Sequence, residues 1–155
     1  MFFRRVYFTS RLETALSLFS NGFQCSQAVL ASFAPQLGME EEKAIRVAGA
    51  FGGGVGHTGG TCGAVNGAFM VIGLKYADIN AKNYKAMKKS YAVAREFIKR
   101  FETLNGSTIC KDLIKCDIST SEGIKYAIDK NLFTSVCPKF VQDSVEILEE
   151  LLKED

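Results

Sequence analysis

The sequence Gly49-Ala-Phe-Gly-Gly-Gly-Val-Gly-His-Thr-Gly-Gly-Thr-Cys-Gly-Ala-Val-Asn-Gly-Ala68 holds most of the glycine in this chain. Ten of the fourteen glycines lie between Gly49 and Gly73, and Cys62 and the only histidine, His57, lie there too. Glycine loses more conformational freedom on folding than any other residue, so such a density needs a structural reason. We therefore expect the backbone here to approach a ligand, another helix or other cysteines closely.

The remaining composition is that of one globular domain spanning residues 1–155, with 47% hydrophobic and 23% charged residues. A net charge of +2 gives no general attraction to nucleic acid. The longest apolar run, Ala68-Phe-Met-Val-Ile-Gly-Leu74, is shorter than the roughly 20 residues that a transmembrane helix needs. The N-terminus lacks the apolar core of a secretory signal, and we expect a cytoplasmic protein.

Helical periodicity and the presence of only two prolines predict an all-α fold. We expect a single-domain helical bundle of about six to eight helices, with a Gly-rich loop before a central helix. The expected helices cover approximately residues 10–19, 25–35, 40–48, 62–76, 83–104, 107–115, a segment from 119 or 120, and a last helix from 137. Thr61 is the expected N-cap of the central helix, and Ser107 is that of the short one. The residues expected to face the core from the fifth helix are Tyr84, Met87, Tyr91, Ala94, Ile98 and Phe101.

Four of the five cysteines fall at expected helix N-termini: Cys25, Cys62, Cys110 and Cys137. Free backbone N–H groups and the positive end of the helix dipole stabilise a thiolate there, which lowers the pKa of the thiol. Cys116 differs, because it follows an expected helix end. The alternative is that each cysteine packs as a small apolar residue. No Cys-x-x-Cys pair occurs, so any joint site must be assembled by the fold.

The Gly-rich segment allows several interpretations. His57 could act as a base, as a metal ligand or as a charge near Cys62, or it could be an exposed loop residue. Small residues at four-residue spacing allow close helix packing: Gly63, Ala64, Gly67 and Ala68. The candidate cofactor-binding residues surround the expected helix start, where N–H groups can bind an anion: Gly59, Gly60, Thr61 and Gly63. The Gly-Lys-Ser/Thr ending of a phosphate loop is absent, which excludes a Walker-type nucleotide site.

The motif Gly60-Thr-Cys-Gly-Ala-Val-Asn-Gly67, with Cys25 before it and Cys110 and Cys137 after it, resembles the family named for its cysteine pattern, C_GCAxxG_C_C. The family is described as redox-active. The resemblance covers about residues 21–151 and implies a small domain with four characteristic cysteines, here Cys25, Cys62, Cys110 and Cys137. The CGAxxG motif of this chain contains one cysteine, Cys62, and no second cysteine adjoins it. Cys116 is additional to the four characteristic cysteines.

Three functions remain open at this point. The first is thiol–disulfide chemistry centred on Cys62, in a thiol-dependent oxidoreductase with a partner protein or small thiol. The second is a module in which the four cysteines bind a metal or an iron–sulfur cluster. The cofactor is therefore open: either none, or a metal or iron–sulfur cluster bound by these cysteines. The third is a helical interaction protein that acts with a transporter, as the resemblance implies. A close-packing glycine face is also compatible with a homo-oligomer.

Overall fold

The computed structural model describes residues 10–153. The all-α expectation is confirmed, because these residues form helices and no strand. The described residues form ten α-helices. Two of these, α4 and α9, are only four residues long, and the other eight are longer. None of the described helices has the length and apolar character needed to cross a bilayer. The elements are α1 (Arg11–Ser20), α2 (Cys25–Phe33), the 3-10 helix η1 (Ala34–Leu37), α3 (Glu41–Val47), α4 (Gly52–Val55), α5 (Gly63–Tyr76), α6 (Tyr84–Asn105), α7 (Cys110–Ile114), α8 (Ser121–Asp129), α9 (Leu132–Ser135) and α10 (Cys137–Lys153).

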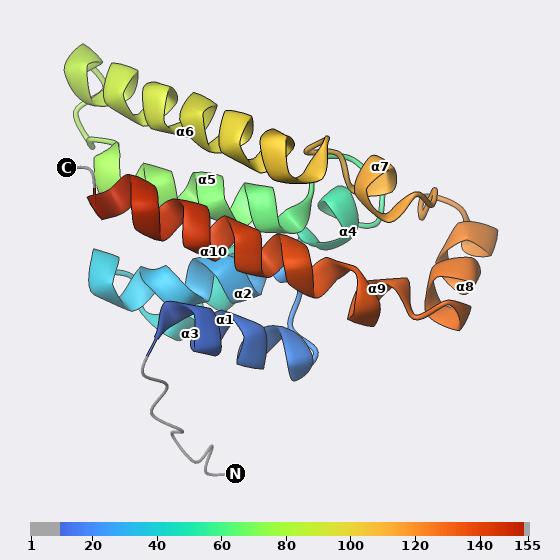
Figure 1. The fold of residues 1–155 in the computed structure, drawn as a ribbon. Coiled ribbons are helices and arrows are strands. Elements are labelled where there is room, and N and C mark those ends of the chain that lie inside the picture. Colours follow the sequence, from blue (N-terminus) through green and yellow to red (C-terminus); the bar gives the residue numbers. More distant parts are fainter. Residues whose placement is uncertain (1–9, 154–155) are drawn as a thin grey trace, which may run out of the picture.

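The long helices lie side by side: α2 packs directly against α5, and α10 packs against α1, α2, α5 and α6 (Figure 1). α2, α5 and α10 all begin at the same end of the bundle and run toward the other end (Figure 1). The end of the bundle where these helices begin also holds α4, α7, α8 and α9 (Figure 1). α6 runs in the opposite direction, back toward this end (Figure 1). The bundle therefore brings several helix N-termini together at one end.

Several helix ends follow directly from the local sequence. The Ser10 hydroxyl accepts a hydrogen bond from the Glu13 N–H at the start of α1. The Asn83 side chain does the same for Ala86 in α6, and Gly106, at φ 83°, ends that helix in the left-handed conformation. Both helices begin close to residues 10 and 83, where the sequence predicts their starts.

Two predicted caps are wrong. Cys62, not Thr61, is the N-cap of α5, and Ile109, not Ser107, is the N-cap of α7. The reason is a short extended pairing that local sequence does not show. The Cys62 N–H donates to the Thr108 oxygen at 2.8 Å, and the Cys110 N–H donates to the Gly60 oxygen at 2.6 Å. This pairing keeps both segments extended up to the two cysteines.

The buried face of α6 also differs from the prediction at its N-terminal half. Tyr84, Met87 and Tyr91 are exposed rather than in the core. The inward stripe consists of Ala86, Ser90, Val93, Phe97 and Phe101. Small side chains thus face the bundle near the start of α6, whereas the prediction gave weight to the large apolar ones. Of the predicted residues, Phe101 is fully buried and Ala94 packs partly buried against the core, whereas the buried Val93 and Phe97 were not predicted.

α2 and α5 pack closely because α5 presents glycine to α2. A Cβ atom at Gly67 would lie 2.8 Å from the Ser26 oxygen and 3.0 Å from the Val29 Cβ. A Cβ at Gly63 would overlap the Cys25 sulfur and lie 2.9 Å from the Phe51 oxygen. The predicted small-residue face is therefore confirmed, and its neighbour is the helix that begins with Cys25.

We expect Gly67→Ala to destabilise the protein by about 1–3 kcal/mol, because the added methyl group forces α2 and α5 apart. This loss exceeds the gain of about 1 kcal/mol that alanine brings to a helix interior. Gly73→Ala is the matched control in the same helix, since a Cβ there meets nothing within 4 Å. Thermal unfolding should show a lower midpoint for Gly67→Ala and an equal or higher one for Gly73→Ala. Equal midpoints for both variants would contradict the close contact.

Candidate functional site

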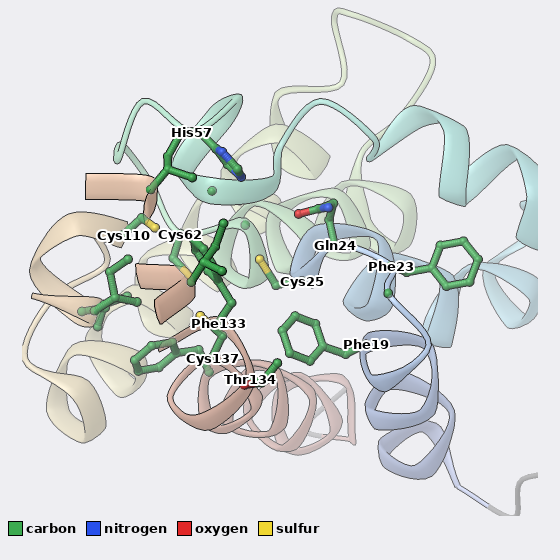
Figure 2. Close-up of a pocket in the computed structure, with 18 residues that line it drawn as sticks. Phe19, Phe23, Gln24, Cys25, His57, Cys62, Cys110, Phe133, Thr134 and Cys137 are labelled. Atoms are coloured by element: carbon green, nitrogen blue, oxygen red, sulfur yellow. The ribbon is translucent and has the colours of Figure 1, made fainter. Parts of the chain in front are cut away.

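Four cysteines line one cavity of about 360 Å³ at the end of the bundle where the helices begin (Figure 2). Cys25, Cys110 and Cys137 are the first residues of α2, α7 and α10, and Cys62 is the N-cap of α5. All are free thiols. The structure therefore brings together the four cysteines that the sequence singled out, from four separate elements.

The cavity wall is mostly apolar. Its large apolar side chains come from α1 and the turn after it, from α7, from α8, and from α9 and α10: Phe19, Phe23, Leu113, Ile114, Ile124, Ile128, Phe133 and Phe140. Among the described residues that line it, none is Asp, Glu, Lys or Arg. The exposed residues Gly22, Gln24, Ile128 and Thr134 belong to the lining, so the cavity opens to solvent beside them.

Cys25 and Cys62 form a closely placed pair. The Cys62 thiol hydrogen-bonds to the Cys25 sulfur, and that sulfur packs against the bare Cα of Gly63, the residue after Cys62. Cys25 is half-buried, whereas Cys62 is only 4% exposed. Cys25 is thus the more accessible residue of the pair, and Cys62 is the more deeply buried one.

The surroundings of Cys25 favour its thiolate. The hydrogen bond from the Cys62 thiol is the main cause that lowers the pKa of Cys25 from 9.0 to about 7. Burial opposes this shift, and the backbone N–H groups of Ser26, Gly53 and Ala64 add to it. These contacts favour the charged form of the Cys25 side chain.

The other three cysteines have raised pKa values, which corrects the prediction that every helix N-terminus activates its thiol. The hydrogen bond to Cys25, burial and the negative charge of Cys25 hold the pKa of Cys62 well above 9.0. Burial raises the pKa of Cys110 to about 11 and that of Cys137 to about 12. Loss of hydration outweighs the helix terminus at these positions. Of the four thiols in the cavity, only Cys25 has a lowered pKa.

The Gly-rich segment forms a tight loop that bonds mainly to itself. Gly54, at φ 68°, lies so close to α7 that a Cβ would be 2.7 Å from the Cβ of Cys110. The N–H groups of Gly59 and Gly60 donate to the oxygens of Gly53 and Gly54 at 3.1 and 2.9 Å. They are consequently not free to bind an anion.

Thr61 takes part in the pairing with Ile109 and does not line the cavity. Of the four candidate cofactor-binding residues, only Gly63 does so. The loop therefore brings sulfur-bearing elements together and does not cradle a phosphate, as the absence of a phosphate-loop ending indicated.

His57 lies at the rim of the cavity (Figure 2). Its ring stacks on Phe133 with centroids 6.0 Å apart and an interplanar angle of 10°. Gly53 makes room for this ring, since a Cβ there would overlap it. His57 is half-buried and not an exposed loop residue, and its contact with Phe133 joins the glycine loop to α9.

Within residues 10–153, no three His, Cys, Asp or Glu side chains form a group that could hold a metal ion.

Cys116 is absent from the cavity wall. Its sulfur donates to the Gly123 oxygen at 3.3 Å, which ties the turn after α7 to α8. Cys116 thus has a structural contact of its own, apart from the other four cysteines.

The sequence reasoning missed the contribution of α8 and α9. Ile124, Ile128 and Phe133 line the cavity, although no helix was predicted over Leu132–Ser135. The four-residue spacing of Ile124 and Ile128 was the available signal, since it places two large apolar side chains on one face of a helix.

The family model described as "Putative redox-active protein (C_GCAxxG_C_C)" matches residues 23–151. This match includes all four cysteines of the cavity and most of the chain. No curated protein and no solved structure matches the sequence. The chain belongs to the C_GCAxxG_C_C family.

Proposed function

We propose that this protein is a dithiol–disulfide redox protein in which Cys25 is the attacking thiolate and Cys62 the resolving thiol. The observation that carries this proposal is the placement of Cys25 and Cys62 together in the wall of an open cavity, with the Cys25 sulfur against Gly63, the residue after Cys62. The thiolate is the reactive form of cysteine, and a sulfur with a pKa near the ambient pH combines charge with nucleophilicity. Cys25 meets both conditions and is also partly exposed.

In the first step the Cys25 thiolate attacks a disulfide of the oxidant, and one thiolate of that oxidant leaves. A mixed disulfide with Cys25 results. The Cys62 thiol, which had donated its hydrogen bond to the Cys25 sulfur, remains protonated until then because its pKa is held high. Two neighbouring negative charges on buried sulfurs are thereby avoided.

In the second step Cys62 becomes the nucleophile. Once Cys25 is bonded to the substrate, its negative charge no longer raises the pKa of Cys62. The N–H groups of Val65 and Ala64, which lower that pKa, remain in place. Cys62 then loses its proton, attacks the Cys25 sulfur and expels the second thiolate of the substrate. The products are a Cys25–Cys62 disulfide and two reduced sulfur atoms, one of which takes the proton.

The pair would work in a compartment that keeps thiols reduced, and we place the protein in the cytoplasm on this ground. Cys110 and Cys137 stay protonated at neutral pH because of their burial, so we assign them to the cavity wall and not to the first exchange. The electrons go to an external disulfide, and the reverse reaction reduces the pair.

Oxidation should remove two thiols and reduction should restore them. We expect five titratable thiols in the reduced protein after denaturation, and three after oxidation with diamide and removal of the reagent. Cys25→Ser and Cys62→Ser should each keep the remaining four thiols under the same treatment, whereas Cys116→Ser should still lose two. An unchanged count in the wild type, or stoichiometric metal in protein purified without air, would contradict the proposal.

The reactivity of Cys25 should depend on pH with a midpoint near 7, because a lowered pKa leaves the thiolate present above that value. The midpoint is measured from the rate of iodoacetamide labelling at Cys25, followed by mass spectrometry. Cys62→Ala removes the hydrogen-bond donor and should move the midpoint upward. Cys62→Ser keeps a donor and should leave it low.

A midpoint that is the same in Cys62→Ala as in the wild type would show that Cys62 does not activate Cys25. Cys116→Ser is the matched control, since Cys116 is outside the cavity and should not affect the midpoint.

A further inference from the structure

The cavity beside the cysteine pair constrains which oxidants can reach it. Its volume of about 360 Å³ is at the lower end of the range of small-molecule sites, about 300–1,000 Å³. Cys62 and Cys110 lie deep in it, at 4% and 7% exposure.

The wall offers no partner for a charged ligand. Within the described chain no Asp, Glu, Lys or Arg side chain lines the cavity, and its polar side chains other than thiols come from Gln24, His57 and Thr134. Moving an unpaired charge from water into such surroundings is costly. The Cys25 thiolate further repels anions. A tripeptide disulfide such as oxidised glutathione, which carries several charges, is therefore a poor fit.

We infer that the cavity binds a small, uncharged, apolar disulfide and presents it to the Cys25–Cys62 pair. This inference rests on the proposed function and adds the class of substrate. The aromatic rings of Phe19, Phe133 and Phe140 contact the organic groups of the disulfide, and Cys25 attacks the nearer sulfur. The Cys25 thiolate, the Cys62 thiol and the disulfide RSSR give the Cys25–Cys62 disulfide, one RS⁻ and one RSH. Charge, protons and the two transferred electrons balance.

The test compares an uncharged with a charged oxidant of similar size. The rate of thiol loss is measured with dipyridyl disulfide, which is neutral, and with dithiobis(nitrobenzoate), a dianion. The ratio of the two rate constants is divided by the same ratio for dithiothreitol, an uncharged dithiol without a cavity. We expect the protein to prefer the neutral reagent by at least about tenfold after this correction.

Two lysine variants of α8 distinguish the effect of a charge at the cavity from that of a charge elsewhere on the surface. Ile128 is exposed and lines the cavity, whereas Tyr126 is similarly exposed on the same helix and does not line it. Ile128→Lys places a cation at the mouth and should reduce the preference for the neutral reagent about threefold or more. Tyr126→Lys adds the same charge outside the cavity and should retain the preference.

A corrected ratio near one, or equal effects of the two lysine variants, would overturn the inference. The proposed function would survive that result, provided that the reagents still produced the Cys25–Cys62 disulfide. If neither reagent produced it, both the proposed function and the substrate class would be wrong.

Discussion

The contact between α2 and the beginning of α5 is the constraint on which the site depends. Gly63 and Gly67 let the two helices approach until backbone and sulfur atoms touch the α5 surface. Because Cys25 begins α2 and Cys62 precedes Gly63, the same contact sets one sulfur against the other. A side chain at Gly63 would occupy the position of the Cys25 sulfur. The glycines of the CGAxxG motif are thus a packing requirement of the cysteine pair.

Burial and hydrogen bonding divide the roles among four cysteines that occupy similar helix positions. A helix N-terminus stabilises a thiolate by a modest amount, and loss of hydration can exceed it. Cys110 and Cys137 are desolvated without a strong donor, so their pKa values rise. Cys25 receives a hydrogen bond from a neighbouring thiol in addition to backbone N–H groups, and its pKa falls. The difference between them lies in their neighbours and not in their place on a helix.

The sequence was sufficient for the all-α fold and for the gathering of the four cysteines. Helix ends marked by Ser10, Asn83 and Gly106 could be predicted because the capping chemistry is local. The start of α5 could not, since the bond between Cys62 and Thr108 joins residues far apart in the chain. The identity of the activated cysteine was out of reach for the same reason. It depends on which thiol donates to which, whereas helix position applied equally to Cys25, Cys62, Cys110 and Cys137.

The crystal structure of the oxidised protein is the most direct measurement of the central claim. Our account predicts electron density for a bond between the sulfur atoms of Cys25 and Cys62, with Cys110 and Cys137 as free thiols beside an open cavity. A bond between Cys110 and Cys137 would contradict it, as would a metal ion or cluster held by the four sulfur atoms.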